Sequence, residues 1–152
     1  MKVLLVGLDN PQSSDPRHAL FPRPAGCTGD RLLGIIQSVD AEFSMSEYHA
    51  VPKTNLFPVG ACPKKFKAVY LVEAGQHLRA QLRGRGAKIV LLGNDVRAAV
   101  FQTATAPEKP GEFVKFFGAE YAWIPHPSGR NHYYNDPKHV KKIGKFLLET
   151  LR

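Results

Sequence analysis

The chain has 152 residues, of which 43% are apolar and 10% aromatic, as in an ordinary globular protein of one domain. Its formal net charge of +8 and pI near 9.7 favour an anionic partner, either nucleic acid or an anionic membrane surface. Nucleic acid is favoured, because no segment is both strongly basic and strongly apolar, as a membrane-surface helix is. We therefore expect a single domain over residues 1–152.

The sequence does not favour a metal site, a leader peptide or a membrane span. Cys27 and Cys62 are too few to form a zinc site or an iron–sulfur cluster by themselves, and we expect both to be buried thiols. The apolar run after Met1 is too short for a secretory leader or a membrane span. These features predict a soluble, cytoplasmic protein, and we expect it to be a monomer.

The first third of the chain predicts a strand, a long loop and a helix. Residues 2–8 form a continuous apolar run, which is typical of a parallel strand covered on both faces. Residues 12–27 form a proline-rich loop, and loops this long in compact domains are usually functional or disordered. Thr28 is the expected N-cap of a helix with Leu32, Ile35, Ile36 and Val39 on its buried face.

The rest of the chain continues the alternation of strands and helices. A short extended piece is expected at residues 48–52, the longest helix at residues 64–83, and a second apolar strand at residues 87–93. Asn94 is expected to cap the next helix, residues 113–124 to supply the last strand or strand pair, and Asp136-Pro137 to open a terminal helix. This order predicts a three-layer α/β/α sandwich around a mostly parallel, four-stranded sheet.

Polar side chains follow three of the apolar segments. Asp9, Asn55 and His126 each come where a predicted strand ends. The carboxyl ends of parallel strands meet at one edge of the sheet, where open α/β folds bind their ligands. Each residue taken alone also fits an ordinary turn, but their common position predicts one site.

Three short segments resemble motifs of the uracil-DNA glycosylase superfamily. They are Gly7-Leu8-Asp9-Asn10-Pro11, Asn55-Leu56-Phe57-Pro58 and His126-Pro127-Ser128-Gly129-Arg130-Asn131. They are similar, in the same order, to the superfamily's G-x-[DN]-P element, its central asparagine followed by a proline, and its H-P-S-x-x-[SN] element. Residues 87–100 resemble the strand–helix unit before the last motif, so the likeness spans nearly the whole chain. The last motif is closest to the single-strand-selective monofunctional branch.

The resemblance implies a monofunctional DNA glycosylase that flips uracil, or a related deaminated or modified base, out of DNA and hydrolyses its N-glycosidic bond without metal or cofactor. Asp9 would orient or deprotonate the attacking water and stabilise the cationic sugar, a type of role worth about 10²–10⁴-fold in rate. His126, as a neutral imidazole, would donate a hydrogen bond to O2 of the leaving base. Loss of one such donor costs about 2.7–4 kcal/mol where it has been measured.

The resemblance also assigns residues to base and DNA binding. Asn55 would read the base, because its amide accepts from uracil N3–H and donates to O4, the reverse of the pattern that cytosine presents. Phe21 is the candidate stacking aromatic. The other candidates are Leu8 and Asn10 for the base, Arg130 as the wedge that replaces the flipped nucleotide, and Pro127, Ser128, Gly129 and Asn131 for the DNA backbone.

Two positions depart from the family pattern. Asn10 stands between Asp9 and Pro11, where the family has proline directly after the acid. Gln12 stands where the uracil-selective branch has a tyrosine that blocks the methyl group of thymine. The first departure bears on the orientation of Asp9, and the second bears on the exclusion of thymine.

Two other functions are compatible with the sequence. A non-catalytic DNA-binding protein on the same fold agrees with the altered first motif and the net charge. A hydrolase or transferase for free nucleosides or nucleotides is the other alternative. A triad of Ser128, His126 and Asp9 is formally available to it, but Ser128 lacks the G-x-S-x-G turn that exposes a nucleophile.

Overall fold

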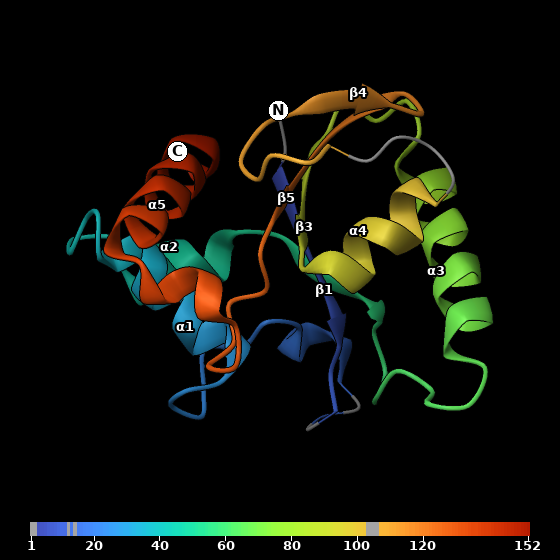
Figure 1. The fold of residues 1–152 in the computed structure, drawn as a ribbon, viewed down its shortest axis with the longest axis horizontal. Coiled ribbons are helices and arrows are strands. Elements are labelled where there is room, and N and C mark those ends of the chain that lie inside the picture. The colour runs from blue at the N-terminus through green and yellow to red at the C-terminus, as the bar shows by residue number, and fades with distance from the viewer. Residues whose placement is uncertain (1–2, 12, 14, 103–106) are drawn as a thin grey trace.

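The protein folds around a five-stranded sheet with the strand order β2-β1-β3-β5-β4. The computed structural model describes residues 3–11, 13, 15–102 and 107–152. The strands are β1 (Val3–Asp9), β2 (Lys53–Phe57), β3 (Lys88–Leu92), β4 (Val114–Phe116) and β5 (Ala119–Ile124). Helices cover both faces of the sheet (Figure 1). The predicted three-layer α/β/α sandwich is confirmed, but the sheet has one strand more than the four expected, because β4 pairs with β5 as an antiparallel edge strand.

The topology creates a crevice at one end of the sheet. Strands β2, β1, β3 and β5 are parallel. From β1 the chain passes outward to β2 and then crosses to β3 on the other side of β1. Ligands of open α/β sheets bind at such a change of direction, outside the carboxyl ends of the strands. The loops after β1, β2 and β5 lie at this end, which is the lower end of the sheet in Figure 1.

Two hydrophobic clusters hold the three layers together. Leu5 of β1 packs on the side of α1 (Thr28–Gln37), α2 (Met45–Ala50) and α5 (Pro137–Leu151). The next residue, Val6, packs on the side of α3 (Lys67–Leu82) and α4 (Asn94–Phe101). Figure 1 shows these two groups of helices on opposite sides of the sheet. Successive side chains of a strand point to opposite faces, so a strand buried on both faces needs the unbroken apolar sequence seen in β1 and β3.

The terminal helix agrees closely with its prediction. Asp136 caps α5, since its Oδ1 accepts from the backbone N–H of Lys138 at 2.9 Å, and Pro137 is the first helical residue. Ile143 and Leu147 are fully buried. The long helix α3 is shorter than predicted and begins at Lys67 rather than at residue 64.

Three local predictions are wrong. Residues 48–52 do not form an extended piece, because α2 occupies most of this stretch and is stabilised by a reciprocal capping box between Ser44 and Glu47. The N-cap of α1 is Cys27 rather than Thr28. Gly93, not Asn94, is the N-cap of α4.

The cysteines are also less buried than expected. Cys27 and Cys62 are free, half-buried thiols, not fully buried ones. The Sγ of Cys27 donates to the carbonyl of Phe21 at 3.3 Å and ties the long loop to the start of α1. No helix in the described part of the chain is both long and apolar enough to cross a bilayer.

Candidate functional site

Asp9 is the last residue of β1 and lies at the crevice. Its Oδ2 accepts a hydrogen bond from the backbone N–H of Cys62 at 2.7 Å. Cys62 belongs to the loop after β2, so this bond joins the ends of two neighbouring strands. The carboxylate is half-buried, and one of its oxygens is thereby fixed in direction.

Asn10, the residue after Asp9, has its own structural partners. The backbone N–H of Asn10 donates to the carbonyl of Gly60 at 3.0 Å, and the two residues form an isolated antiparallel bridge. The side-chain amide of Asn10 donates to the carbonyl of Asp15 at 3.3 Å. Asn10 therefore prolongs β1 toward the loop after β2, while Gln12 lies outside the described residues.

Asn55 lies in the middle of β2, not after its end as expected. It pairs with Gly7 of β1, two residues before Asp9. Asn55 is 5% exposed, and neither Nδ2 nor Oδ1 has a hydrogen-bond partner in the described part of the chain. A Cβ on Gly7 would lie 2.4 Å from this Oδ1. Glycine is therefore required at position 7 if the amide is to stay where it is.

Unpaired buried polar atoms are costly and call for an explanation. Among the described residues, two other buried groups share this condition: the hydroxyl of Tyr121 and the indole N–H of Trp123, both on β5. Asn55 differs from them because it has both an unpaired donor and an unpaired acceptor, in the middle of β2 beside Gly7. Such a pair is suited to a ligand with complementary groups.

His126 is held by a stiff loop after β5. The hydroxyl of Tyr134 donates to the carbonyl of Pro125 at 2.5 Å, and Nδ2 of Asn131 donates to the carbonyl of His126 at 3.0 Å. Gly93, with φ of 94°, lies next to His126, since a Cβ on Gly93 would lie 3.1 Å from Cβ of His126. The glycine between β3 and α4 thus leaves room for the histidine.

Burial lowers the pKa of His126 below its ordinary value of 6.5, while the negative charges of Asp9 and Asp95 act in the opposite direction. The imidazole is therefore neutral at pH 7. It is also near enough to Asp9 to respond to its charge, which places the two expected catalytic groups in one electrostatic environment.

Three further residues belong to this environment and were missed in the sequence. Asp95, in the first turn of α4, forms an ion pair with Lys67 of α3 at 2.9 Å. Burial raises the pKa of the Cys62 thiol; the charge of Lys67 lowers it, and those of Asp9 and Asp95 raise it. Asp95 could have been predicted as a site residue, because it comes soon after the apolar strand β3. The positions of Lys67 and Cys62 could not, because they depend on the path of the loop after β2.

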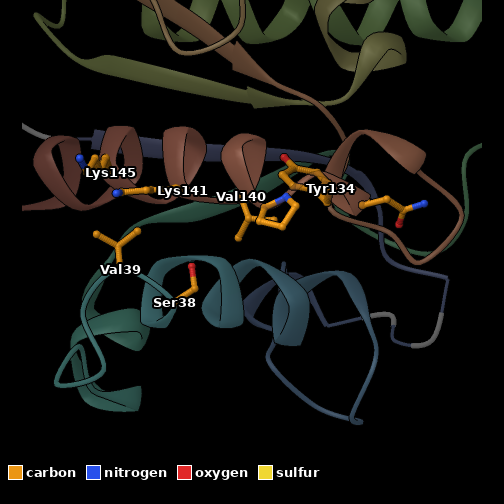
Figure 2. A pocket seen from close by; sticks show the side chains of 8 residues that line it. Ser38, Val39, Tyr134, Val140, Lys141 and Lys145 are labelled. Carbon is orange, nitrogen blue, oxygen red and sulfur yellow. The ribbon is translucent and has the colours of Figure 1, made fainter.

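An open cleft of about 480 Å³ lies beside Asp9. Phe21, Ser128 and Gly129 also line it. Asn55 and His126 are not among its lining residues, and the side chain of Leu20 lies next to Gly7, 3.1 Å from the position of a Cβ there. The structure therefore brings Asp9 and Phe21 together at an open surface, with the Asn55 amide buried beneath. A larger hollow lies between α1 and α5 (Figure 2).

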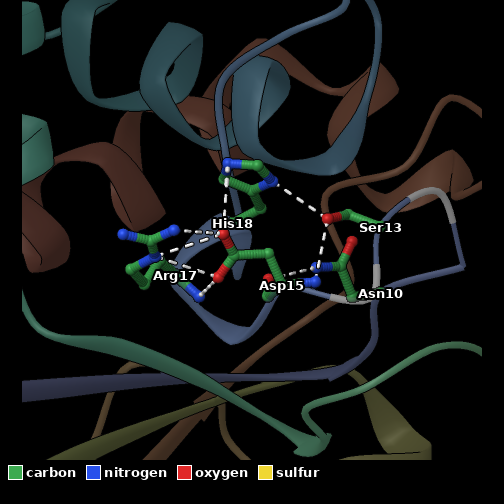
Figure 3. A network of polar contacts seen from close by, with 5 residues as sticks. All are labelled: Asn10, Ser13, Asp15, Arg17 and His18. Carbon is green, nitrogen blue, oxygen red and sulfur yellow. Dashed lines mark hydrogen bonds and ion pairs between the residues drawn. The ribbon is translucent and has the colours of Figure 1, made fainter.

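A polar network fixes the loop that carries Phe21 (Figure 3). Asp15 caps the short 3-10 helix Pro16–His18 and binds the guanidinium of Arg17 through both carboxylate oxygens. The Arg17 hydrogen bonds lower the pKa of Asp15 to about 2. Ser13 joins the network through Nδ1 of His18, at 2.9 Å. Phe21 is 41% exposed. It therefore lies at the surface, on a loop that these hydrogen bonds stabilise.

The predicted DNA-binding loop is only partly free for a ligand. Gly129 and Arg130 are exposed, Ser128 is half-buried and Pro127 is buried. Both side-chain atoms of Asn131 bond within the loop, since Oδ1 accepts from the N–H of Tyr133 at 3.0 Å. Leu8, expected near the base, packs against the hydrophobic cluster between the sheet and helices α3 and α4.

The sequence was compared with known proteins. No model of a protein family matches it, and no curated protein matches it either.

Proposed function

We propose that the protein is a DNA glycosylase that removes uracil, or a related deaminated or modified base, from DNA. The observation that supports this most is the position of Asp9 and His126. Asp9 ends β1 and His126 follows β5, and these two strands flank β3. The charge of Asp9 acts on His126, and Gly93 leaves room for the imidazole. The net charge of +8 suits a polyanionic substrate.

The two groups have complementary tasks in breaking the N-glycosidic bond. Asp9 holds the attacking water with the carboxylate oxygen that Cys62 does not bind, and its charge stabilises the cationic sugar. His126 donates a hydrogen bond to the oxygen on which the leaving base gathers negative charge. A neutral histidine suits this task, and burial keeps His126 neutral at pH 7.

Asn55 is the proposed base-reading residue. Its free donor and acceptor match the O4 and N3–H of uracil, and cytosine would leave both unpaired. Leu20 lies against Gly7 beside this amide, so we infer that its side chain moves when a base enters. Phe21, at the mouth of the same cleft as Asp9, supplies a stacking surface for that base.

An excision assay tests the proposal. The protein is incubated with single-stranded and duplex oligonucleotides that carry one uracil, hypoxanthine, xanthine or hydroxymethyluracil, and abasic sites are then cleaved with alkali. Strand breaks at the modified base are expected. Absence of breaks on all these substrates would refute the proposal, and release of base from a mononucleotide but not from the polymers would assign the site to free nucleotides.

A non-catalytic DNA-binding protein is the second candidate. It is favoured by the engagement of Asp9 with Cys62 and by the added residue Asn10, which bridges to Gly60. This candidate predicts salt-dependent DNA binding without excision, and unchanged binding in Asp9→Asn. The excision assay therefore separates the two.

A further inference from the structure

Two further hollows lie next to the cleft beside Asp9. Ser128 lines both this cleft and a second hollow of about 350 Å³, and Tyr134 and Val140 line both the second hollow and a third, of about 610 Å³. We call the second and third hollows together the α1–α5 groove. Figure 2 shows its far part, where Ser38 and Val39 face Val140, Lys141 and Lys145 across the seam between the two helices.

The seam itself is rigid. A Cβ on Gly144 of α5 would lie 2.5 Å from Cγ2 of Val39 and 2.7 Å from the carbonyl oxygen of Ile35, so the two helices touch at this glycine. Tyr134 lines both hollows of the groove. Its hydroxyl donates to the carbonyl of Pro125, which fixes the position of the ring. The groove is therefore a fixed feature, anchored to the loop that carries His126.

The groove carries mainly positive charge. Its charged lining residues are Arg31, Lys141, Lys145 and Asp30. Asp30 is occupied, since it accepts from the N–H of Gly26 at 2.8 Å and lies 3.7 Å from Arg23. The guanidinium of Arg31 lies over Gly129, 2.6 Å from the position of a Cβ there, which brings a cation to the point where the groove meets the cleft.

Lys141 and Lys145 are free to meet an anion. Both are exposed, and within the described ranges neither forms an ion pair. Residues four apart on a helix have Cβ atoms about 5–6 Å from each other, so the two ammonium groups form a short cationic row on the α5 side. By contrast, Arg17, Lys67 and Arg152 are each paired with an acid.

We propose that the α1–α5 groove binds a single strand of nucleic acid that extends from the nucleotide in the Asp9 cleft. A single strand fits better than a duplex, because each hollow has the volume of a small-molecule pocket, about 300–1,000 Å³. Cationic grooves with an aromatic side chain are typical of single-strand binding, and Tyr134 supplies the aromatic surface. The inference rests on the proposed function for one point, the direction in which the strand leaves the Asp9 cleft. That direction is assigned by Ser128, which lines both the cleft and the groove.

Binding of unmodified strands tests the groove. Fluorescence anisotropy is measured with labelled single strands of about 16 and about 4 nucleotides that contain no uracil or other deaminated base. The variant is Lys141→Gln/Lys145→Gln. The control is Arg85→Gln/Lys115→Gln, which removes the same charge from two exposed residues near the amino ends of β3 and β5. Thermal unfolding of both variants checks that they fold.

The wild-type protein and the control variant should bind the long strand more tightly than the short one. The groove variant should lose most of this difference. Its plot of log affinity against log salt should be shallower by about 1.4, since each phosphate contact with a single strand contributes about 0.7. As a second measurement, the long strand should protect Lys141 and Lys145 from acetylation and leave Lys115 reactive.

Three results would overturn the inference: unchanged binding in the groove variant, an equal loss in both variants, or competition by polyglutamate as effective as that by the unlabelled strand. The last would assign the groove to an acidic peptide. The strands contain no base to excise, so a protein that shows the groove effect but no glycosylase activity refutes the proposed function alone. Excision without the groove effect refutes this inference alone.

Discussion

Asn55 and Gly7 face each other across the β1–β2 pair, and the amide oxygen of Asn55 lies 2.4 Å from the position of a Cβ on Gly7. Gly7→Ala should therefore force the amide or the strand to move. We expect a loss of about 1–3 kcal/mol in the free energy of unfolding, the usual cost of adding a carbon to a packed interior. Urea denaturation measures it.

Gly34→Ala is the matched control for this change. A Cβ on Gly34, inside α1, meets nothing within 4 Å, so alanine should stabilise the helix by about 0.5–1 kcal/mol. Equal effects of the two substitutions would show that the amide does not occupy the space beside Gly7.

The unpaired amide of Asn55 predicts a conflict between stability and activity. Asn55→Leu replaces two unsatisfied polar atoms by an apolar group of similar size, so the free energy of unfolding should stay the same or rise by up to about 3 kcal/mol. Excision should fall by about 10²–10³-fold, as on loss of other transition-state hydrogen bonds. Denaturation and single-turnover rates check this together, and a clear loss of stability would mean that the amide has structural partners.

The charge of Asp9 predicts the titration of His126. Because burial lowers the pKa of His126 and Asp9 raises it, the imidazole should titrate below 6.5 in the wild-type protein and lower still in Asp9→Asn. The unfolded chain therefore binds a proton at this histidine at a higher pH than the folded protein does. The free energy of unfolding should for this reason decrease as the pH falls below 6.5. NMR titration of the imidazole protons measures both values. A higher pKa in Asp9→Asn would contradict the arrangement.

The network around Asp15 predicts a positioning role for the loop. Asp15→Asn weakens the carboxylate pair with Arg17 and the cap of the short helix before Phe21, so the KM for excision should rise more than kcat falls. Asp40→Asn is the control, since Asp40 is also paired with an arginine, Arg152, outside the residues that line the Asp9 cleft. A similar rise in KM in both variants would contradict a role of the loop in substrate binding.

The elements found from the sequence are those whose signal is local. The apolar runs of β1 and β3 and the Asp136-Pro137 start of α5 are decided by residues next to one another. Helix α2 was missed, although its capping box, Ser44 followed three residues later by Glu47, is a local signal for the start of a helix.

The site was predicted less fully than the fold. His126 follows its strand as expected, but Asp9 is the last residue of β1 rather than the residue after it, and Asn55 lies inside β2. The roles of Cys62, Lys67 and Asp95 depend on contacts between the loop after β2, α3 and α4. Such contacts join distant parts of the chain and leave no periodic pattern in it.

The central claim is that Asp9 and His126 act on one extruded base, and the single-turnover excision of uracil from a single-stranded oligonucleotide tests it most directly. The wild-type protein should release uracil, and Asp9→Asn and His126→Ala should each slow release by about 10²–10⁴-fold while they still bind the oligonucleotide. No release by the wild-type protein, or equal release by all three proteins, would contradict the account.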